Sequence, residues 1–184
     1  MKRLSVIMGC ILLSPLLAHA GEDQATHEYR GWIENQTLVI KEPAAGSTEG
    51  TLVIGGDAIY KTQFCDENSD YFCFTSQSYA FAVPKRLRPG VSSWTVEGIT
   101  FEVVRENMEV SLFGSRVSGL LMVKLAAGAK YGAEPTDRDA FYLYSPERGL
   151  VAFGFDPAYP YATTYWMEGS KGFGAANEDV ARSP

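Results

Sequence analysis

Short runs of alternating apolar and polar residues, separated by turn-forming residues, make up most of the chain. Residues 37–40 and 51–54 share the letters Thr-Leu-Val-Ile, and the segment between them has the composition of a loop. We expect these two runs to pair as a hairpin with a long loop. Residues 58–65, 71–75 and 79–83 repeat the pattern. No long amphipathic helix interrupts it, so the pattern predicts an antiparallel all-β fold.

The second half of the chain predicts further strands. Residues 94–105 fit one long strand with a bulge at Gly98, because the parity of the apolar positions reverses there. Residues 108–113 alternate apolar and polar side chains and predict another strand. Residues 118–127 fit a buried strand or a short helix, and the surrounding β pattern favours the strand.

Residues 140–155 predict a tight hairpin. Pro146 suits the second position of a type I turn, and Gly149 provides a positive φ. A last strand is expected over residues 163–167. The glycine-rich residues 169–174 include a lysine, but not in the order of a phosphate-binding loop, and this segment is expected to be flexible.

These elements predict one all-β domain over residues 21–174, either a single antiparallel β-barrel or a β-sandwich. The pattern alone does not separate the two architectures. Residues 175–184 are expected to form a flexible C-terminal tail. Residues 21–28 are polar, and we expect them to be frayed.

The N-terminus has a basic start, an apolar run and the small-residue sequence Ala18-His19-Ala20. This order is typical of a secretory signal peptide over residues 1–20. We therefore expect cleavage after Ala20 and a periplasmic or secreted mature protein, not an integral membrane protein. An alternative makes Cys10 the lipidated N-terminus of a lipoprotein, but it leaves an unusually short apolar run.

Loss of the leader would leave Cys65 and Cys73 as the remaining cysteines. In an oxidising compartment such a pair is expected to form a disulfide. A zinc site is the alternative, but it needs four ligands and a different cysteine spacing. The compartment therefore favours the disulfide.

The chain lacks the motifs of common catalytic sites: it has no phosphate-binding loop, dinucleotide fingerprint, nucleophile elbow or zinc-protease helix motif. His27 is the one imidazole outside the leader, and we expect it to be solvated near the new N-terminus. Residues 66–70 begin like a calcium-binding loop but lack its later glycine and glutamate, so a solvated turn is expected. We predict no catalytic residue, cofactor or metal.

Carboxylates could still drive glycoside hydrolysis without a histidine. Glu97, Glu102, Glu106 and Glu109 are the candidates because they are crowded in the sequence. The alternation of the strand places Glu102 and Glu109 on a solvent-facing side, which favours ordinary surface residues.

Two groups of residues are candidates for a binding surface. Tyr159 and Tyr161 flank a proline in an expected loop, and exposed tyrosines are typical of binding surfaces. Lys85, Arg86 and Arg88 form a basic cluster that could contact an anionic partner. The formal net charge is −6, and −8 without the basic pair of the leader, which argues against nucleic acid as the partner.

These observations predict an exported, non-catalytic β domain of the bacterial cell envelope that binds a protein, lipid or glycan. The alternatives are a carboxylate-dependent hydrolase of envelope glycans and a lipid-carrying β-barrel. The hydrolase predicts a cleft with two facing carboxylates, and the lipid carrier predicts a large apolar cavity. The binding domain predicts a filled core and an exposed aromatic patch.

Overall fold

The computed structural model describes residues 24–31, 35–77, 79–112, 114–125, 130–131, 134–135, 140–155 and 164–176. These residues form strands, turns and loops, and none of them is helical. Accordingly, no helix in these segments is long and apolar enough to cross a membrane. The expected signal peptide, residues 1–20, lies outside the described residues.

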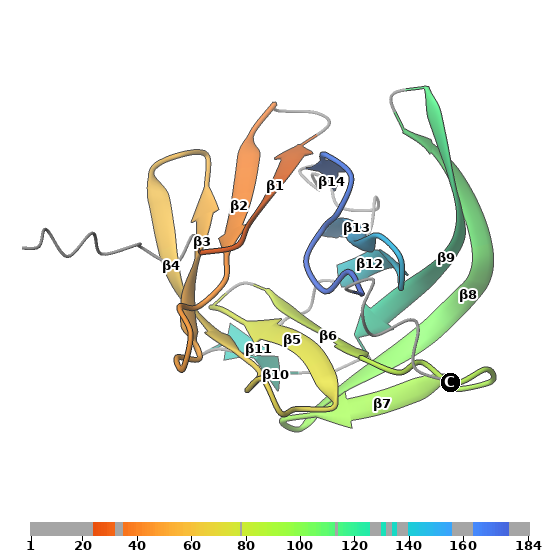
Figure 1. The fold of residues 1–184 in the computed structure, drawn as a ribbon, viewed down its shortest axis with the longest axis horizontal. Coiled ribbons are helices and arrows are strands. Elements are labelled where there is room, and N and C mark those ends of the chain that lie inside the picture. The colour runs from red at the N-terminus through yellow and green to blue at the C-terminus, as the bar shows by residue number, and fades with distance from the viewer. Residues whose placement is uncertain are drawn as a thin grey trace, which may run out of the picture.

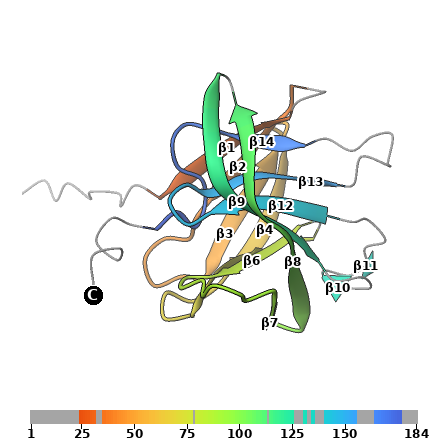
Figure 2. The ribbon, with the colours of Figure 1, turned by 90° about the vertical axis from the view of Figure 1, so that its right-hand side faces the viewer.

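Twelve antiparallel strands form one sheet that curls into a nearly closed barrel (Figures 1 and 2). Their order in the sheet is β6-β5-β4-β3-β2-β1-β14-β13-β12-β9-β8-β7, and β10 and β11 pair separately. The strands are β1 (Thr26–Gly31), β2 (Thr37–Lys41), β3 (Glu49–Ile54), β4 (Ala58–Phe64), β5 (Tyr71–Thr75), β6 (Ala80–Pro84), β7 (Ser93–Val96), β8 (Ile99–Leu112), β9 (Ser115–Leu125), β10 (Lys130–Tyr131), β11 (Glu134–Pro135), β12 (Ala140–Ser145), β13 (Gly149–Phe155) and β14 (Tyr165–Glu168). The all-β prediction is confirmed, and the architecture is barrel-like.

The repeated Thr-Leu-Val-Ile runs pair with each other as the β2–β3 hairpin, as predicted. Leu38 lies opposite Ile54, and Ile40 lies opposite Leu52. Leu38, Ile40 and Leu52 are fully buried. Alternation thus places one side of the hairpin in the core.

The predicted single strand over residues 94–105 is wrong. The chain reverses at Glu97 and Gly98, whose φ angles are 51° and 79°, so β7 and β8 form a two-residue hairpin. Positive φ at both central residues is typical of a type I′ turn. Residues that lie opposite each other across such a turn are an odd number of positions apart, as Trp94 and Phe101 are. Their side chains still point to the same face of the sheet, so the apolar residues change from even to odd positions at the turn. The reversal of apolar parity therefore marks a hairpin and not a bulge.

The β8–β9 hairpin is the longest in the sheet and curves away from its body in Figure 1. Its pairing changes register at three points along β8, and Asn107 has a φ of 54°. Such irregularities bend a strand and increase its twist. The strand expected within residues 118–127 is confirmed as part of β9, and the one expected over residues 108–113 is the second half of β8.

Aromatic side chains from strands that are not neighbours meet inside the barrel. The ring centroids of Tyr29 on β1 and Phe153 on β13 lie 5.2 Å apart. Those of Phe81 on β6 and Tyr142 on β12 lie 5.3 Å apart. All four side chains are at most 1% exposed. The interior at their level is therefore filled by protein.

The edge strands β6 and β7 close the barrel through side chains. Trp94 on β7 donates from Nε1 to the carbonyl oxygen of Ala82 on β6 at 3.0 Å. The hydroxyl of Tyr142 on β12 donates to the carbonyl of Ala80, also on β6. These donors satisfy carbonyls that an edge strand would otherwise present without a ladder partner.

The predicted disulfide is present. Cys65, directly after β4, is bonded to Cys73 on β5, with their Cα atoms 5.2 Å apart. The Cys65 N–H also donates to the Cys73 carbonyl at 3.1 Å. The disulfide therefore holds together the two strands that flank the acidic turn.

Replacing both cysteines in Cys65→Ala/Cys73→Ala is expected to lower the free energy of unfolding by about 2.5 kcal/mol, because a short closed loop is released in the unfolded chain. For a domain of this size the loss corresponds to a drop in Tm of roughly 5–10 °C. Thermal melts with and without a reducing agent measure it. Reduction should shift the melt of the natural chain and leave that of the double variant unchanged; an unshifted natural chain would contradict a stabilising disulfide.

Candidate functional site

The C-terminal segment, residues 169–176, lies against the β12–β13 hairpin. The N–H groups of Gly172 and Leu150 donate to the carbonyls of Arg148 and Phe173 at 2.7 and 2.8 Å. The Ala176 N–H donates to the carbonyl of Pro146 at 2.8 Å. The expectation that residues 169–174 are flexible is wrong for residues 172–174, which are buried and bonded. Of the expected tail, residues 177–184 lie outside the described residues.

Glycines allow this close approach between the segment and the hairpin. A Cβ on Gly172 would lie 2.0 Å from the Leu150 carbonyl oxygen. A Cβ on Gly149 would lie 2.5 Å from the carbonyl oxygens of Gly172 and Phe173. Gly149 also has a φ of 74°, as the predicted turn requires. The glycine-rich composition thus serves backbone packing.

Two buried tyrosines bind the C-terminal segment from inside the barrel. The Tyr29 hydroxyl donates to the Leu150 carbonyl at 3.0 Å and accepts the Phe173 N–H at 3.0 Å. The Tyr144 hydroxyl donates to the Gly174 carbonyl at 3.1 Å. Burial raises the pKa of both phenols above the ordinary value of 10. For Tyr29 the hydrogen bond from Phe173 acts in the opposite direction but is the smaller effect.

The side chain of Phe173 closes one end of the barrel. Its ring centroid lies 5.5, 5.3 and 6.0 Å from those of Phe64, Phe74 and Phe81. Edge-to-face contacts dominate this cluster, which is a favourable arrangement of aromatic rings. Phe173 is 4% exposed and comes from outside any strand.

His27 is part of this closure, and the expectation of a solvated histidine is wrong. The residue lies on β1, which also contradicts the expected fraying of residues 26–28. Its Nε2 is 2.6 Å from Oε1 of Glu42, and its ring meets Phe173 edge-on at 5.9 Å. Pairing with β2 holds the backbone of residues 26–28, and pairing with β14 begins at Glu28.

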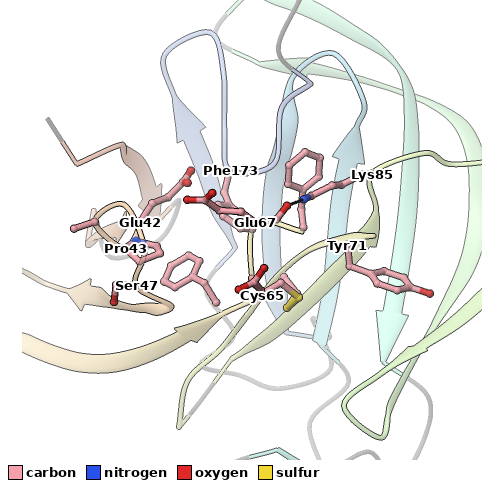
Figure 3. A pocket seen from close by; sticks show the side chains of 13 residues that line it. Glu42, Pro43, Ser47, Cys65, Glu67, Tyr71, Lys85 and Phe173 are labelled. Carbon is pink, nitrogen blue, oxygen red and sulfur yellow. Dashed lines mark hydrogen bonds between the residues drawn. A yellow bond between two sulfur atoms is a disulfide. The ribbon is translucent and has the colours of Figure 1, made fainter. Parts of the chain in front are cut away.

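A hollow of about 270 Å³ opens on the surface beside Phe173 (Figure 3). The β2–β3 loop, the β4–β5 turn with the disulfide, and the C-terminal segment contribute its walls. It is lined by Glu42, Pro43, Ala44, Ser47, Phe64, Cys65, Asp66, Glu67, Tyr71, Phe72, Cys73, Lys85 and Phe173. The lining combines aromatic rings, the disulfide and four charged side chains.

The charged side chains of the hollow are held to different degrees. Lys85 donates from Nζ to the Glu67 carbonyl oxygen at 2.6 Å and stands 5.5 Å from the centroid of Phe72. Asp66 Oδ1 accepts the N–H of Asn68 at 2.8 Å, so the acidic turn is closed by its own side chain. The Glu67 carboxylate makes no hydrogen bond or ion pair with a described residue.

Among the described residues, no three His, Cys, Asp or Glu side chains are grouped to hold a metal ion. Glu97, Glu102, Glu106 and Glu109 are exposed on the β7–β8 hairpin and along β8. None of them lines the hollow. Glu109 faces Arg116, with 3.4 Å between Oε1 and Nε.

The candidate binding residues have different outcomes. Tyr159 and Tyr161 lie outside the described residues. Lys85 lines the hollow, whereas Arg86 and Arg88 are exposed on the loop that follows β6. Leu87 packs between them onto the core. A binding role for these residues stays a prediction.

Sequence reasoning missed the hollow because its walls are distant in the chain. Phe173 was the available signal, since it is one large apolar residue between two glycines.

Comparison of the chain with protein-family models, with curated proteins and with solved structures gave no match.

The Gly172→Ala variant is expected to lose roughly 1–3 kcal/mol of stability, because the added methyl group overlaps the Leu150 carbonyl. Denaturant unfolding measures the loss, and amide exchange of Leu150 and Phe173 locates it. Ser170→Ala, an exposed change in the same segment, should stay within about 0.5 kcal/mol of the natural chain. Unchanged stability and amide protection in Gly172→Ala would contradict the tight docking.

The buried phenols predict alkaline destabilisation. Tyr29 and Tyr144 keep their protons to a higher pH in the folded chain than in the unfolded chain. Their contribution to the free energy of unfolding is therefore complete below pH 10 and falls as the pH rises above it. The slope is at most about 1.4 kcal/mol per pH unit for each phenol. Tyr144→Phe should give a shallower slope in unfolding experiments between pH 9 and 11. Equal slopes would show that this phenol ionises while folded.

Proposed function

We propose that the protein is an exported, non-catalytic binding domain of the bacterial cell envelope, periplasmic or secreted, whose partner is a protein, lipid or glycan. The hollow beside Phe173 is the proposed binding site. One observation carries the proposal. The interior of the barrel is filled by aromatic side chains, whereas the surface beside Phe173 has an open hollow. Binding sites are typically concave, with apolar walls and a few polar groups.

The interior argues against a lipid-carrying barrel. Tyr29, Phe81, Tyr142 and Phe153 come from four different strands and pack across the lumen. An acyl chain at this level would have to displace them. Ligand binding at the surface therefore fits the packing better than enclosure.

The carboxylates of the hollow argue against glycoside hydrolysis. That reaction generally needs one carboxyl group as acid and a second as base or nucleophile. Glu42 is engaged by His27, and Asp66 is engaged within its own turn. Glu67 alone is uncommitted among the described acidic residues that line the hollow. A binding role needs no such pair.

Export is proposed from the leader pattern at residues 1–20. The Cys65–Cys73 disulfide is consistent with an oxidising compartment. The intact mass of protein purified from the periplasm tests this step. We expect a chain beginning at Gly21 with two hydrogens fewer than the dithiol; a chain beginning at Met1 with free thiols would overturn it.

A light-activated crosslinking residue at Ala44 tests the binding site in living cells. Ala44 lines the hollow and is exposed, so its replacement should leave the core intact. The control is the same residue at Ser111, which is exposed on the distant β8–β9 hairpin. We expect a defined adduct at Ala44, at least roughly tenfold above that at Ser111, because a specific site localises its partner.

The mass of the adduct identifies the partner as protein, lipid or glycan. Equal or absent adducts at the two positions would overturn the proposed site. An acyl lipid retained in native mass spectrometry, with no adduct at Ala44, would support the carrier alternative.

A further inference from the structure

We propose that the hollow binds a basic side chain, lysine or arginine, of a partner protein. This inference rests on the proposed function and specifies the partner for that site. It follows from the size of the hollow, from the balance of charge around it and from the way in which the protein already holds one ammonium group there.

The size of the hollow suits a single side chain. Its volume is about 270 Å³. Pockets for drug-sized ligands generally have volumes of about 300–1,000 Å³. An extended polypeptide can cross such a small opening and insert one residue. Recognition of one anchoring side chain in a pocket is common at protein interfaces, and arginine is enriched among such anchors.

The charge around the hollow favours a cation. Three lining carboxylates, those of Glu42, Asp66 and Glu67, face one lining ammonium group, that of Lys85. The formal sum of these four side chains is therefore negative, on a chain that is itself acidic. A carboxylate or phosphate ligand would meet repulsion here, whereas a lysine or arginine would be attracted.

The walls offer a second attraction for the same group. Lys85 shows the arrangement within the protein: its ammonium group donates to a carbonyl and stands over the Phe72 ring. Phe64 and Phe173 line the hollow as well, with the disulfide at the base of the β4–β5 turn. These apolar walls accommodate the aliphatic stem of lysine or arginine.

Glu67 is the residue that would pair with the incoming cation. Its carboxylate is exposed and makes no hydrogen bond or ion pair with a described residue. Glu42 is already bound by His27 and would contribute mainly through its charge. The site thus has one carboxylate free to form a direct ion pair with a ligand.

Titration with two blocked tripeptides tests the inference. The probes are acetyl-Ala-Lys-Ala-amide and its norleucine counterpart, which has a similar stem without the charge. Amide chemical shifts of the isotope-labelled mature protein report binding at the hollow. We expect the lysine peptide to shift residues of the β2–β3 loop and the β4–β5 turn, and the norleucine peptide to bind at least about fivefold more weakly.

Glu67→Gln should weaken binding of the lysine peptide by about two- to fivefold, because an exposed ion pair is lost. The affinity should also depend less on salt concentration. Glu106→Gln makes the same charge change on β8, away from the hollow, and should leave binding unchanged. The amide spectra also verify that both variants remain folded. No binding of the lysine peptide, equal binding of the two peptides, or equal effects of the two substitutions would overturn the inference.

These outcomes are distinguishable from failure of the proposed function. A defined adduct at Ala44 without selectivity for lysine would keep the binding site and remove the basic side chain as its ligand. No adduct at Ala44 would remove both.

Discussion

The hydroxyl group of Tyr29 joins three parts of the chain that are distant in sequence. Through this one atom, β1 binds the carbonyl of Leu150 on β13 and the N–H of Phe173. Losing it would leave a buried donor and a buried acceptor unsatisfied, at about 1–3 kcal/mol each. The bridge holds Phe173 in the end of the barrel, and Phe173 in turn lines the surface hollow. The proposed binding site thus depends on a contact that lies wholly inside the protein.

Side chains also close the barrel where its two edge strands, β6 and β7, meet. β6 and β7 are both short, and β6 ends at Pro84, so neither offers a long row of unpaired backbone groups to another molecule. Trp94 and Tyr142 then cap carbonyls of β6 from within the protein. A sheet completed by side chains at its seam keeps its shape and presents little edge for association.

Elements whose evidence is local could be predicted from the sequence. The β12–β13 hairpin follows from Pro146 and Gly149 and from apolar runs on either side. The β7–β8 turn was missed because Glu97 adopts a positive φ usually taken by asparagine, aspartate or glycine. His27 and Phe173 were missed because their burial depends on partners on other strands, and no local pattern records such contacts. The hollow is formed by segments that are distant in the sequence, so it could be found only from the folded structure.

The pairing of the first described strand with the last has a consequence for how the molecule is made. Tyr29 on β1 lies opposite Met167 on β14, so this part of the sheet cannot form until the chain has been synthesised as far as β14. Contacts so far apart in sequence also slow folding. A chain that ends before β14 lacks the strand that pairs with β1, and it also lacks Phe173, which closes the end of the barrel. The topology therefore keeps the nascent polypeptide open until β14 has been made, which is the state that the proposed export requires.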